Sequence, residues 1–275
     1  MAMLNILVPT DFSDLSKVAI RYALAMAKKM KGKVSLLHVI ETSQHSTGNR
    51  LRLDSLIREL VHIAEEDFEQ LVSEIKDSDK SPGAIKHKIE QGSSFISVVS
   101  KYAKNSRTNL IVMGTHGASG LRKVVMGSNT AAMLEQSKIP VLAVPPQAEF
   151  KSLRSIVYAT DLLNTQKELK KLLTIVGKEK PIIHIIHVAT DRSTATIAET
   201  KIDKVVSKVG YKNAIVRVLI NKNPVPAISE YVRKINIDML SMFPHQYSFF
   251  QKLVKPSVTK QLSYINTAPL LAFKG

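Results

Sequence analysis

The chain carries the same series of strand and helix signals twice, and this repeat limits its fold more than any other feature. Each copy opens with an apolar run ending in Thr-Asp, continues with an apolar run ending in His-Val, and closes with an apolar run around a proline. The matching segments are Ile6–Asp11 with Ile156–Asp161, Val34–Val39 with Ile183–Val188, and Lys138–Val144 with Thr267–Phe273. Because order and spacing agree, the sequence predicts two copies of one domain, at residues 1–147 and 148–275.

Within each copy, apolar runs of strand length alternate with stretches of helical periodicity. This alternation is typical of a parallel sheet covered by helices on both faces, with right-handed crossovers. We therefore predict an α/β fold of two tandem, doubly wound, five-stranded parallel sheets. In the first copy, strands are expected at 4–9, 33–40, 84–90, 109–113 and 139–144, and helices at 14–31, 50–77, 94–106 and 127–137. In the second copy, helices are expected at 164–177, 193–209 and 224–235.

The first expected helix has recognisable ends. Apolar residues recur at helical spacing between Leu15 and Met26, with Ser13 or Asp14 as the N-cap and Gly32 as the stop signal.

Composition narrows the class of protein. The chain is 44% hydrophobic and 23% charged, which is ordinary for a globular protein, and it has no cysteine for disulfides, thiolate metal sites or cysteine nucleophiles. No apolar run reaches the roughly 18–20 residues of a membrane span. The N-terminus resembles a first strand more than a signal peptide, so a cytoplasmic protein is expected.

The positive charge is concentrated in the second copy. Residues 1–147 contain 19 Lys and Arg against 14 Asp and Glu, whereas residues 148–275 contain 20 against 9. A basic surface attracts anionic partners, but a solubilising excess is the simpler interpretation, because the lysines are scattered and aromatic residues are few. Nucleic acid and membrane are therefore not expected as partners.

A glycine-rich segment separates the fourth expected strand of the first copy from the helix that follows. Gly114 and Gly117 come after the strand, and Gly127-Ser128 precedes the helix. Glycines at a strand exit let backbone N–H groups approach phosphate oxygens, and a helix N-terminus adds partial positive charge. A single glycine pair would indicate only a tight turn. The additional Gly-Ser and the Pro-Thr-Asp strand end favour a nucleotide site.

In a doubly wound sheet, ligands bind outside the carboxyl ends of the strands, where the strand order reverses. This rule selects Pro9-Thr10-Asp11, the main chain at Val39 and the glycine segment. Asp11 is expected either to bind ribose hydroxyls or to cap the following helix, and Val39 to contact the adenine edge. The backbone N–H groups and hydroxyls of residues 127–130 are expected to bind the phosphates.

Other polar residues near this edge have two interpretations each. His116 contacts a phosphate or hydrogen-bonds within its own loop, and Arg122 and Lys123 neutralise phosphate charge or remain solvated. His38 and His187, which recur inside apolar strands, are expected to be hydrogen-bonded histidines of the core.

These motifs resemble the universal stress protein family, in tandem form. ATP-binding members carry Gly, two residues, Gly, nine residues, Gly, then Ser or Thr, as do Gly114, Gly117 and Gly127-Ser128 here. The resemblance implies a Rossmann-like sheet of the adenine nucleotide alpha hydrolase type with four helices, adenine-nucleotide binding, and pairing of domains through the last strand. By this resemblance, the ATP site would be lined by Pro9, Thr10, Asp11, Val39, Met113, Gly114, His116, Gly117, Gly127, Ser128, Asn129 and Thr130.

The second copy departs from the family pattern at the glycines. Aligning Met113 with Met242 places Phe243 and Gln246 at the first two glycines, and Pro256 at the third. Five other positions keep the residue type of the first copy, namely Thr160, Asp161, His245, Ser257 and Thr259. Since the backbone cradle is lost, we expect one nucleotide site per chain, in residues 1–147.

The sequence thus predicts an ATP-binding universal stress protein that acts as a nucleotide-dependent regulator or sensor, with Mg²⁺ or Mn²⁺ bound through the phosphates. A weak ATPase or phosphotransferase and a non-catalytic interaction scaffold remain as alternatives. No acid–base pair, metal triad or P-loop lysine is recognisable, so no catalytic residue is assigned. The two domains are expected to pair within the chain through their last strands, which leaves a homodimer open.

Overall fold

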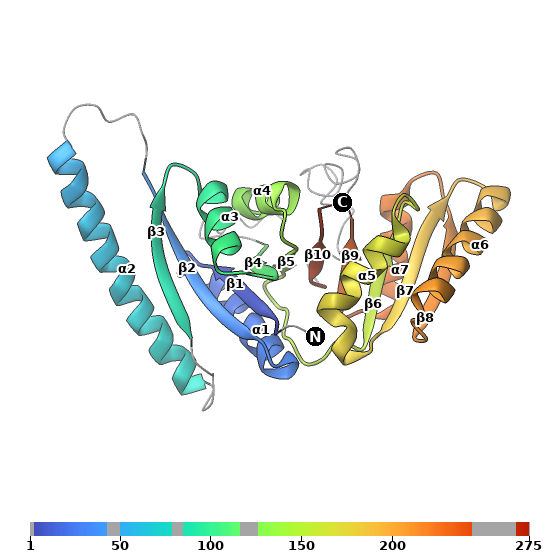
Figure 1. Ribbon diagram of the computed structural model, residues 1–275, viewed down its shortest axis with the longest axis horizontal. Coiled ribbons are helices and arrows are strands. Elements are labelled where there is room, and N and C mark those ends of the chain that lie inside the picture. Colours follow the sequence, from blue (N-terminus) through green and yellow to red (C-terminus); the bar gives the residue numbers. More distant parts are fainter. Residues whose placement is uncertain (1–2, 43–49, 79–84, 116–125, 244–267, 275) are drawn as a thin grey trace. The chain divides into compact units, whose positions relative to one another are not determined.

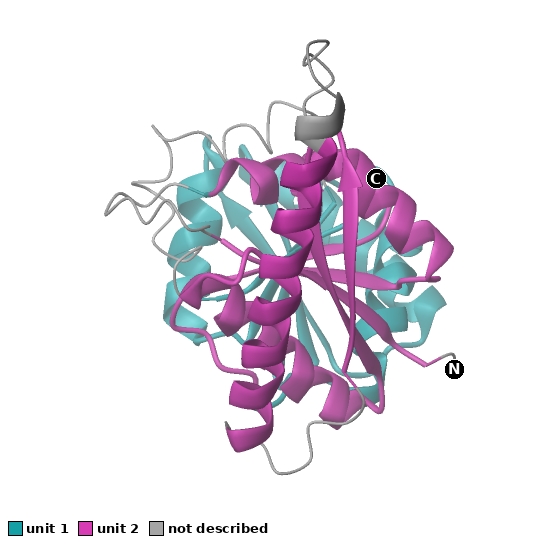
Figure 2. Ribbon diagram, turned by 90° about the vertical axis from the view of Figure 1, so that its left-hand side faces the viewer, with its two compact units in different colours: residues 1, 121–126, 151–275 teal, residues 2–120, 127–150 magenta. Residues whose placement is uncertain are grey.

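A computed structural model describes residues 3–42, 50–78, 85–115, 126–243 and 268–274. The described residues divide into two compact units (Figure 2): the first, in magenta, contains those of 3–115 and 127–150, and the second, in teal, contains Met126 and those of 151–274. The two units share the order of strands and helices from the first strand to the fourth, apart from a short 3₁₀ helix in the second, and each ends with a fifth strand (Figure 1). No helix in the described ranges combines the length and the apolar character needed to cross a membrane.

The first unit is a parallel sheet with the strand order β3-β2-β1-β4-β5. Its order along the chain is β1 (Asn5–Pro9), α1 (Asp14–Met30), β2 (Lys33–Glu41), α2 (Arg50–Ser78), β3 (Lys86–Gly92), α3 (Phe95–Asn105), β4 (Leu110–Gly114), α4 (Ser128–Gln136) and β5 (Val141–Val144). The helices α1 and α2 cover one face and α3 and α4 the other, as right-handed crossovers require.

The second unit has the equivalent order β8-β7-β6-β9-β10, again with parallel neighbours. Its elements are β6 (Ser155–Ala159), α5 (Thr165–Val176), a short 3₁₀ helix η1 (Gly177–Glu179), β7 (Ile182–Ala189), α6 (Arg192–Val209), β8 (Ala214–Ile220), α7 (Pro224–Ile235), β9 (Met239–Met242) and β10 (Leu270–Ala272). The predicted fold class of two five-stranded parallel sheets is therefore confirmed, and the predicted elements lie within about three residues of those observed.

Burial explains why the strands were recognisable. All residues of β9 are buried, as are four of the five in β1 and in β4, because helices cover both faces of these central strands. The last strands β5 and β10 are also buried throughout. The strand β3 at the other end of its sheet has no buried residue and its sequence, KHKIEQG, is largely polar. The apolar runs therefore mark the buried strands, whereas β3 is the polar exception.

The ends of α1 show how local sequence positions the strands. Ser13 is the N-cap, as predicted, and its hydroxyl accepts a hydrogen bond from the Ser16 N–H at 3.2 Å. The C-cap is Lys31, whose φ of 54° is left-handed. The adjacent Gly32 helps to end the helix, as predicted, because its N–H donates to the Ala27 carbonyl at 2.8 Å. In addition, a Cβ on Gly32 would lie 2.6 Å from the carbonyl oxygen of Leu4. Gly32 thus permits a close backbone approach where β2 begins beside β1.

We expect Gly32→Ala to destabilise the protein by about 1–3 kcal/mol, because two backbone segments must separate to admit a methyl group. The matched control is Gly177→Ala, where the nearest atom to an added Cβ is 3.7 Å away and φ is −63°. The free energy of unfolding of that variant should lie within about 0.5 kcal/mol of the wild-type value, since space and backbone geometry both allow alanine. Urea unfolding followed by circular dichroism measures both; equal effects would contradict the assignment.

Candidate functional site

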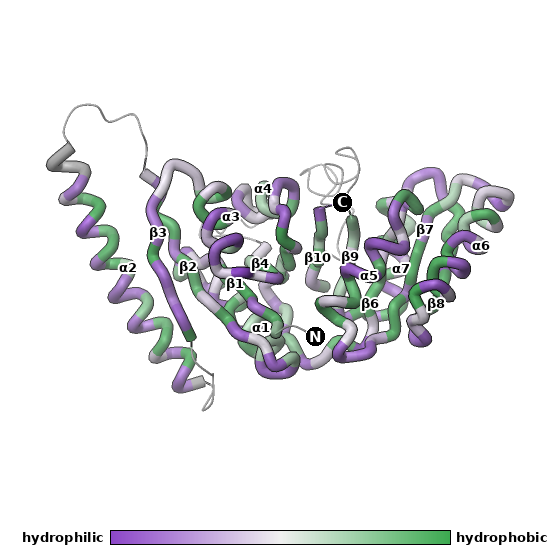
Figure 3. Tube along the Cα trace, viewed as in Figure 1, coloured by the Kyte–Doolittle hydropathy of each residue, from purple (hydrophilic) through white to green (hydrophobic). Residues whose placement is uncertain are grey.

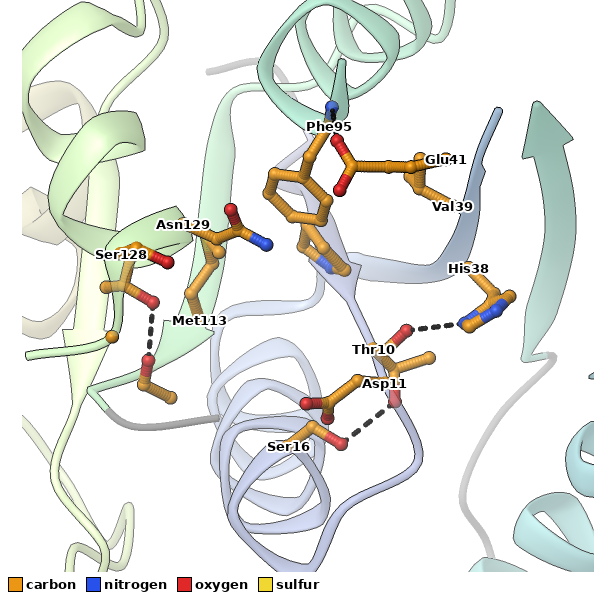
Figure 4. Close-up of a pocket in the computed structure, with 14 residues that line it drawn as sticks. Thr10, Asp11, Ser16, His38, Val39, Glu41, Phe95, Met113, Ser128 and Asn129 are labelled. Atoms are coloured by element: carbon orange, nitrogen blue, oxygen red, sulfur yellow. Dashed lines mark hydrogen bonds between the residues drawn. The ribbon is translucent and has the colours of Figure 1, made fainter. Parts of the chain in front are cut away.

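A pocket opens at the carboxyl ends of β1, β2 and β4, where the strand order of the first unit reverses (Figure 4). Its volume is about 300 Å³, at the lower end of the range of ligand pockets. The N-termini of α3 and α4 also reach it. It is lined by Pro9, Thr10, Asp11, Ser16, His38, Val39, Glu41, Phe95, Met113, Gly114, Gly127, Ser128, Asn129 and Thr130.

The exit from β1 is a tightly hydrogen-bonded turn. The Thr10 hydroxyl accepts from the Phe12 N–H at 3.0 Å and shares a hydrogen bond with the Ser16 hydroxyl at 3.0 Å. Asp11 Oδ1 accepts from the N–H of Ser13 at 3.2 Å and from its hydroxyl at 2.6 Å. Phe12 has a left-handed φ of 61°. Asp11 therefore orients the capping residue of α1 and is not itself the cap.

His38 and Glu41 connect β2 to the neighbouring elements of the pocket. Nδ1 of His38 lies 2.9 Å from the carbonyl oxygen of Thr10, which links the second strand to the turn after the first (Figure 4). Glu41 Oε1 accepts from the Phe95 N–H at 2.6 Å and so supplies the side-chain acceptor for the start of α3. The half-buried His38 is hydrogen-bonded, as expected, but it belongs to the pocket wall.

The start of α4 lacks a side-chain cap among the described residues. Its N-cap is Gly127, which has no side-chain acceptor, and the N–H of Gly127 donates to the Thr115 carbonyl at 2.7 Å. The Thr130 hydroxyl donates to the Gly114 carbonyl at 2.7 Å, so its proton is committed within the protein. Among the described residues, no side chain is seen to cap the first N–H groups of α4, which lie at the pocket together with the positive end of the helix dipole.

The structure brings ten of the twelve predicted site residues to this pocket; the other two, His116 and Gly117, lie outside the described residues, as do Arg122 and Lys123. Four lining residues were not assigned to the site from sequence: Ser16, His38, Glu41 and Phe95. For His38 the sequence contained a usable feature, because the second strand ends in His-Val in both copies. The contact of Glu41 with Phe95 joins two elements distant in sequence and had no local signal.

The described residues contain no group of three His, Cys, Asp or Glu side chains that could hold a metal ion. Asp11 and Glu41 are the two carboxylates in the pocket lining.

The second unit retains the turn after its first strand. Thr160 accepts from the Leu162 N–H at 3.1 Å, Asp161 accepts from the Leu163 N–H at 3.0 Å, and Leu162 has a φ of 69°. Nδ1 of His187 lies 2.9 Å from the Thr160 carbonyl, as His38 does from Thr10. The Thr-Asp pair and the histidine therefore have a structural role in both units.

The two units differ at the strand equivalent to β4. Phe243, at the position of Gly114, is buried and stacks on Phe273 with 4.3 Å between ring centroids. Its edge meets Tyr158, whose hydroxyl donates to the buried Glu168. Burial and the nearby carboxyl raise the pKa of Tyr158 well above its ordinary range, so the phenol keeps this proton. Aromatic rings thus pack at the strand exit where the first unit has a glycine. The remaining predicted replacements, Gln246 and Pro256, lie outside the described residues, as do His245, Ser257 and Thr259.

Comparisons with known proteins agree with this description. The model of the universal stress protein family matches residues 3–145. A universal stress protein of Methanocaldococcus jannaschii is 28% identical over 152 residues, which cover 51% of this chain and 93% of that protein. A universal stress protein of Synechocystis sp. is 23% identical over 292 residues, covering 99% of this chain and 100% of that protein. The crystal structure of a universal stress protein from Archaeoglobus fulgidus is similar in fold, with a TM-score of 0.66, 22% identity, and coverage of 98% of this chain and 96% of that one.

The structural role of the Thr-Asp turn can be tested in the second unit. Thr160→Val removes the acceptor for the Leu162 N–H and the buried partner of the Thr165 hydroxyl. We expect a loss of about 1–3 kcal/mol in the free energy of unfolding, because buried polar groups are left without partners. Thr160→Ser keeps the hydroxyl, so its loss in the free energy of unfolding should be clearly smaller than that of Thr160→Val. Urea denaturation compares the two; similar losses would assign the effect to packing alone.

Proposed function

Because the chain belongs to the universal stress protein family, we propose that its first unit binds an adenine nucleotide, with ATP as the expected ligand. We further propose that occupancy of this site sets the state in which the protein acts as a stress-response regulator. Catalysis is not part of the proposal.

The observation that carries the proposal is the start of α4 at the pocket, for which the described residues supply no side-chain cap. The starts of α1 and α3 have acceptors from Ser13 and Glu41, whereas α4 begins at a glycine. Unpaired N–H groups at the positive end of a helix dipole are a site for phosphate. The phosphates would therefore lie against residues 127–130, held by backbone N–H groups and by the hydroxyl of Ser128.

The opposite side of the pocket suits a nucleoside. Val39 and Phe95 supply main-chain and apolar surface for a base, and Asp11 supplies a carboxylate for ribose hydroxyls. A carboxylate is acceptor-only and therefore matches hydroxyl donors. In the glycine segment, His116 and Gly117 are proposed as further ligand contacts on the strength of the family motif.

A divalent cation, Mg²⁺ or Mn²⁺, is proposed to accompany the phosphates. These ions prefer oxygen ligands and commonly bind through one or two carboxylates plus substrate phosphates. The pocket fits this pattern, because its lining includes the carboxylates of Asp11 and Glu41. When bound, the ion would neutralise phosphate charge.

The second unit is proposed to lack this activity. Phe243 stacks on Phe273 at the strand exit, and a bulky ring there removes the close backbone approach that glycine allows. We therefore expect one nucleotide per chain, which isothermal titration of the full chain with Mg-ATP measures directly. No binding, or two equal sites, would overturn the proposal.

We expect Ser128→Glu to weaken ATP binding at least about tenfold, or about 1.4 kcal/mol, while leaving adenosine binding unchanged. The new carboxylate repels phosphate, yet it favours the N-terminus of α4 and replaces an exposed residue, so the fold should be kept. Thr196→Glu, on an exposed face of α6, adds the same charge in the second unit and should have no effect. Equal losses for ATP and adenosine would mean that the phosphates lie elsewhere.

We expect Asp11→Asn to weaken ATP binding about 10- to 100-fold, because hydrogen bonds to charged groups contribute about 1.5–3 kcal/mol. Asparagine retains an oxygen for the Ser13 contacts, so the turn should persist. The chain supplies the matched control: Asp161→Asn makes the same change at the equivalent turn of the second unit. A titration in which both variants bind ATP as the wild type does would remove Asp11 from the site.

A further inference from the structure

Helix α2 is longer than the strands on which it packs. Its 29 residues correspond to about 43 Å at 1.5 Å per residue. The strands β2 and β3 have 9 and 7 residues, or about 30 and 23 Å. One part of the helix must therefore extend beyond the sheet, and burial shows which part. Buried positions begin at Ala64 and continue through Ile75, whereas none occurs from Asp54 to Ile63.

The extended half of α2 presents apolar side chains to solvent. Leu56, Leu60 and Ile63 are 51%, 40% and 47% exposed, and their spacing of four and three residues places them on one face. Hydrophobic and hydrophilic residues alternate along this helix in Figure 3. We call these three residues the α2 stripe. Three neighbouring exposed aliphatic side chains differ from isolated surface residues and indicate a contact surface.

Carboxylates surround the α2 stripe. Between Asp54 and Gln70 the helix contains six Asp and Glu residues and one arginine, a formal charge of −5. Glu59 and Glu66 lie four residues before and three after Ile63, so they border the stripe on the helix surface. A partner for this surface needs an apolar floor and positive charge.

The second unit offers a surface of that kind between α5 and α6. A cavity of about 680 Å³ is lined by four lysines and no carboxylate, namely by Leu162, Leu163, Asn164, Thr165, Gln166, Lys167, Lys170, Lys171, Thr174, Lys201 and Val205. We call it the α5–α6 groove. Leu163, which is 62% exposed, contributes apolar surface. The groove therefore combines positive charge with aliphatic contact area.

The positive charge of the groove is not neutralised by a described residue. Nζ of Lys201 donates to the Leu162 carbonyl at 3.0 Å and that of Lys171 to the Lys274 carbonyl at 3.4 Å, and both acceptors are uncharged. Among the described ion pairs, none involves a groove lysine. In the first unit, by contrast, Lys17 of α1 pairs with Glu74 of α2 at 2.7 Å.

We propose that the α2 stripe of one chain docks in the α5–α6 groove of a second copy of the same chain. Glu59 and Glu66 face the groove lysines, and the aliphatic side chains of the stripe cover Leu163 and Val205. Two chains can make this contact twice, in a closed two-fold dimer, or once, head-to-tail, which leaves one stripe and one groove free to bind further chains.

The first test is sedimentation velocity of the full chain without nucleotide. At low ionic strength the average mass rises above that of the 30.5 kDa monomer as concentration increases. In about 1 M salt, where charges are screened beyond about 3 Å, association weakens at least about tenfold. A monomer at every concentration overturns the proposal. The nucleotide site is not involved, so this outcome leaves the proposed function intact.

The second test uses two variants that are each defective in one surface. The stripe variant is Glu59→Lys with Glu66→Lys, and the groove variant is Lys167→Glu with Lys170→Glu; all four positions are exposed, so the fold should be kept. Neither variant associates with itself. Mixed together, they form a 1:1 complex that does not grow, because only the wild-type stripe and the wild-type groove can pair. No complex on mixing overturns the proposal.

A charge control and a ligand control complete the design. Lys204→Glu with Lys208→Glu makes the same charge change on α6 outside the groove lining, and this variant associates as the wild type does. Loss of association here assigns the effect to net charge and overturns the proposal. Tripolyphosphate is the probe for a small-anion site: if it binds the groove while the wild type stays monomeric, the occupant is an anion and not the α2 stripe.

Discussion

The common direction of the strands in each unit is the constraint on which the candidate site depends. Because β1, β2 and β4 run parallel, their carboxyl ends open on one edge of the sheet. The crossover from β1 leads toward β2 and that from β4 toward β5, so the space between the two exits is covered by neither. Thr10, Gly114 and the start of α4 meet there although they are far apart in sequence.

The internal repeat separates residues that serve the fold from those that serve a ligand. The Thr-Asp turn and the histidine beneath it have the same hydrogen bonds in both units. In each unit these contacts join the turn after the first strand to the following residues and to the second strand. The glycine at the exit of β4 is different, because the second unit has the stacked Phe243 there and remains folded. We therefore propose that the glycine at this position serves the ligand and not the fold.

The sequence predicted the elements well because each follows from local chemistry. Central strands are buried on both faces and appear as apolar runs, and Ser13 caps α1 through a contact three residues away. It was less informative where a residue's role comes from a distant neighbour. Gly32 ends α1 as predicted, through its hydrogen bond to the Ala27 carbonyl, but its close approach to the Leu4 carbonyl had no local signal. Likewise, Glu41 capping α3 and the exposed half of α2 depend on which elements lie side by side.

By itself, the sequence determined the two-fold repeat, the parallel α/β class and most of the residues that line the pocket. Periodicity, glycine spacing and strand-end polarity are local properties, and the parallel topology converts them into positions at one edge. Only the tertiary structure decided how those residues are engaged. It showed that the Thr130 hydroxyl donates to the Gly114 carbonyl, that Asp11 accepts from Ser13, and that no described side chain caps the start of α4. The reason is that a hydrogen bond or an uncovered surface depends on neighbours in space, which the order of residues does not specify.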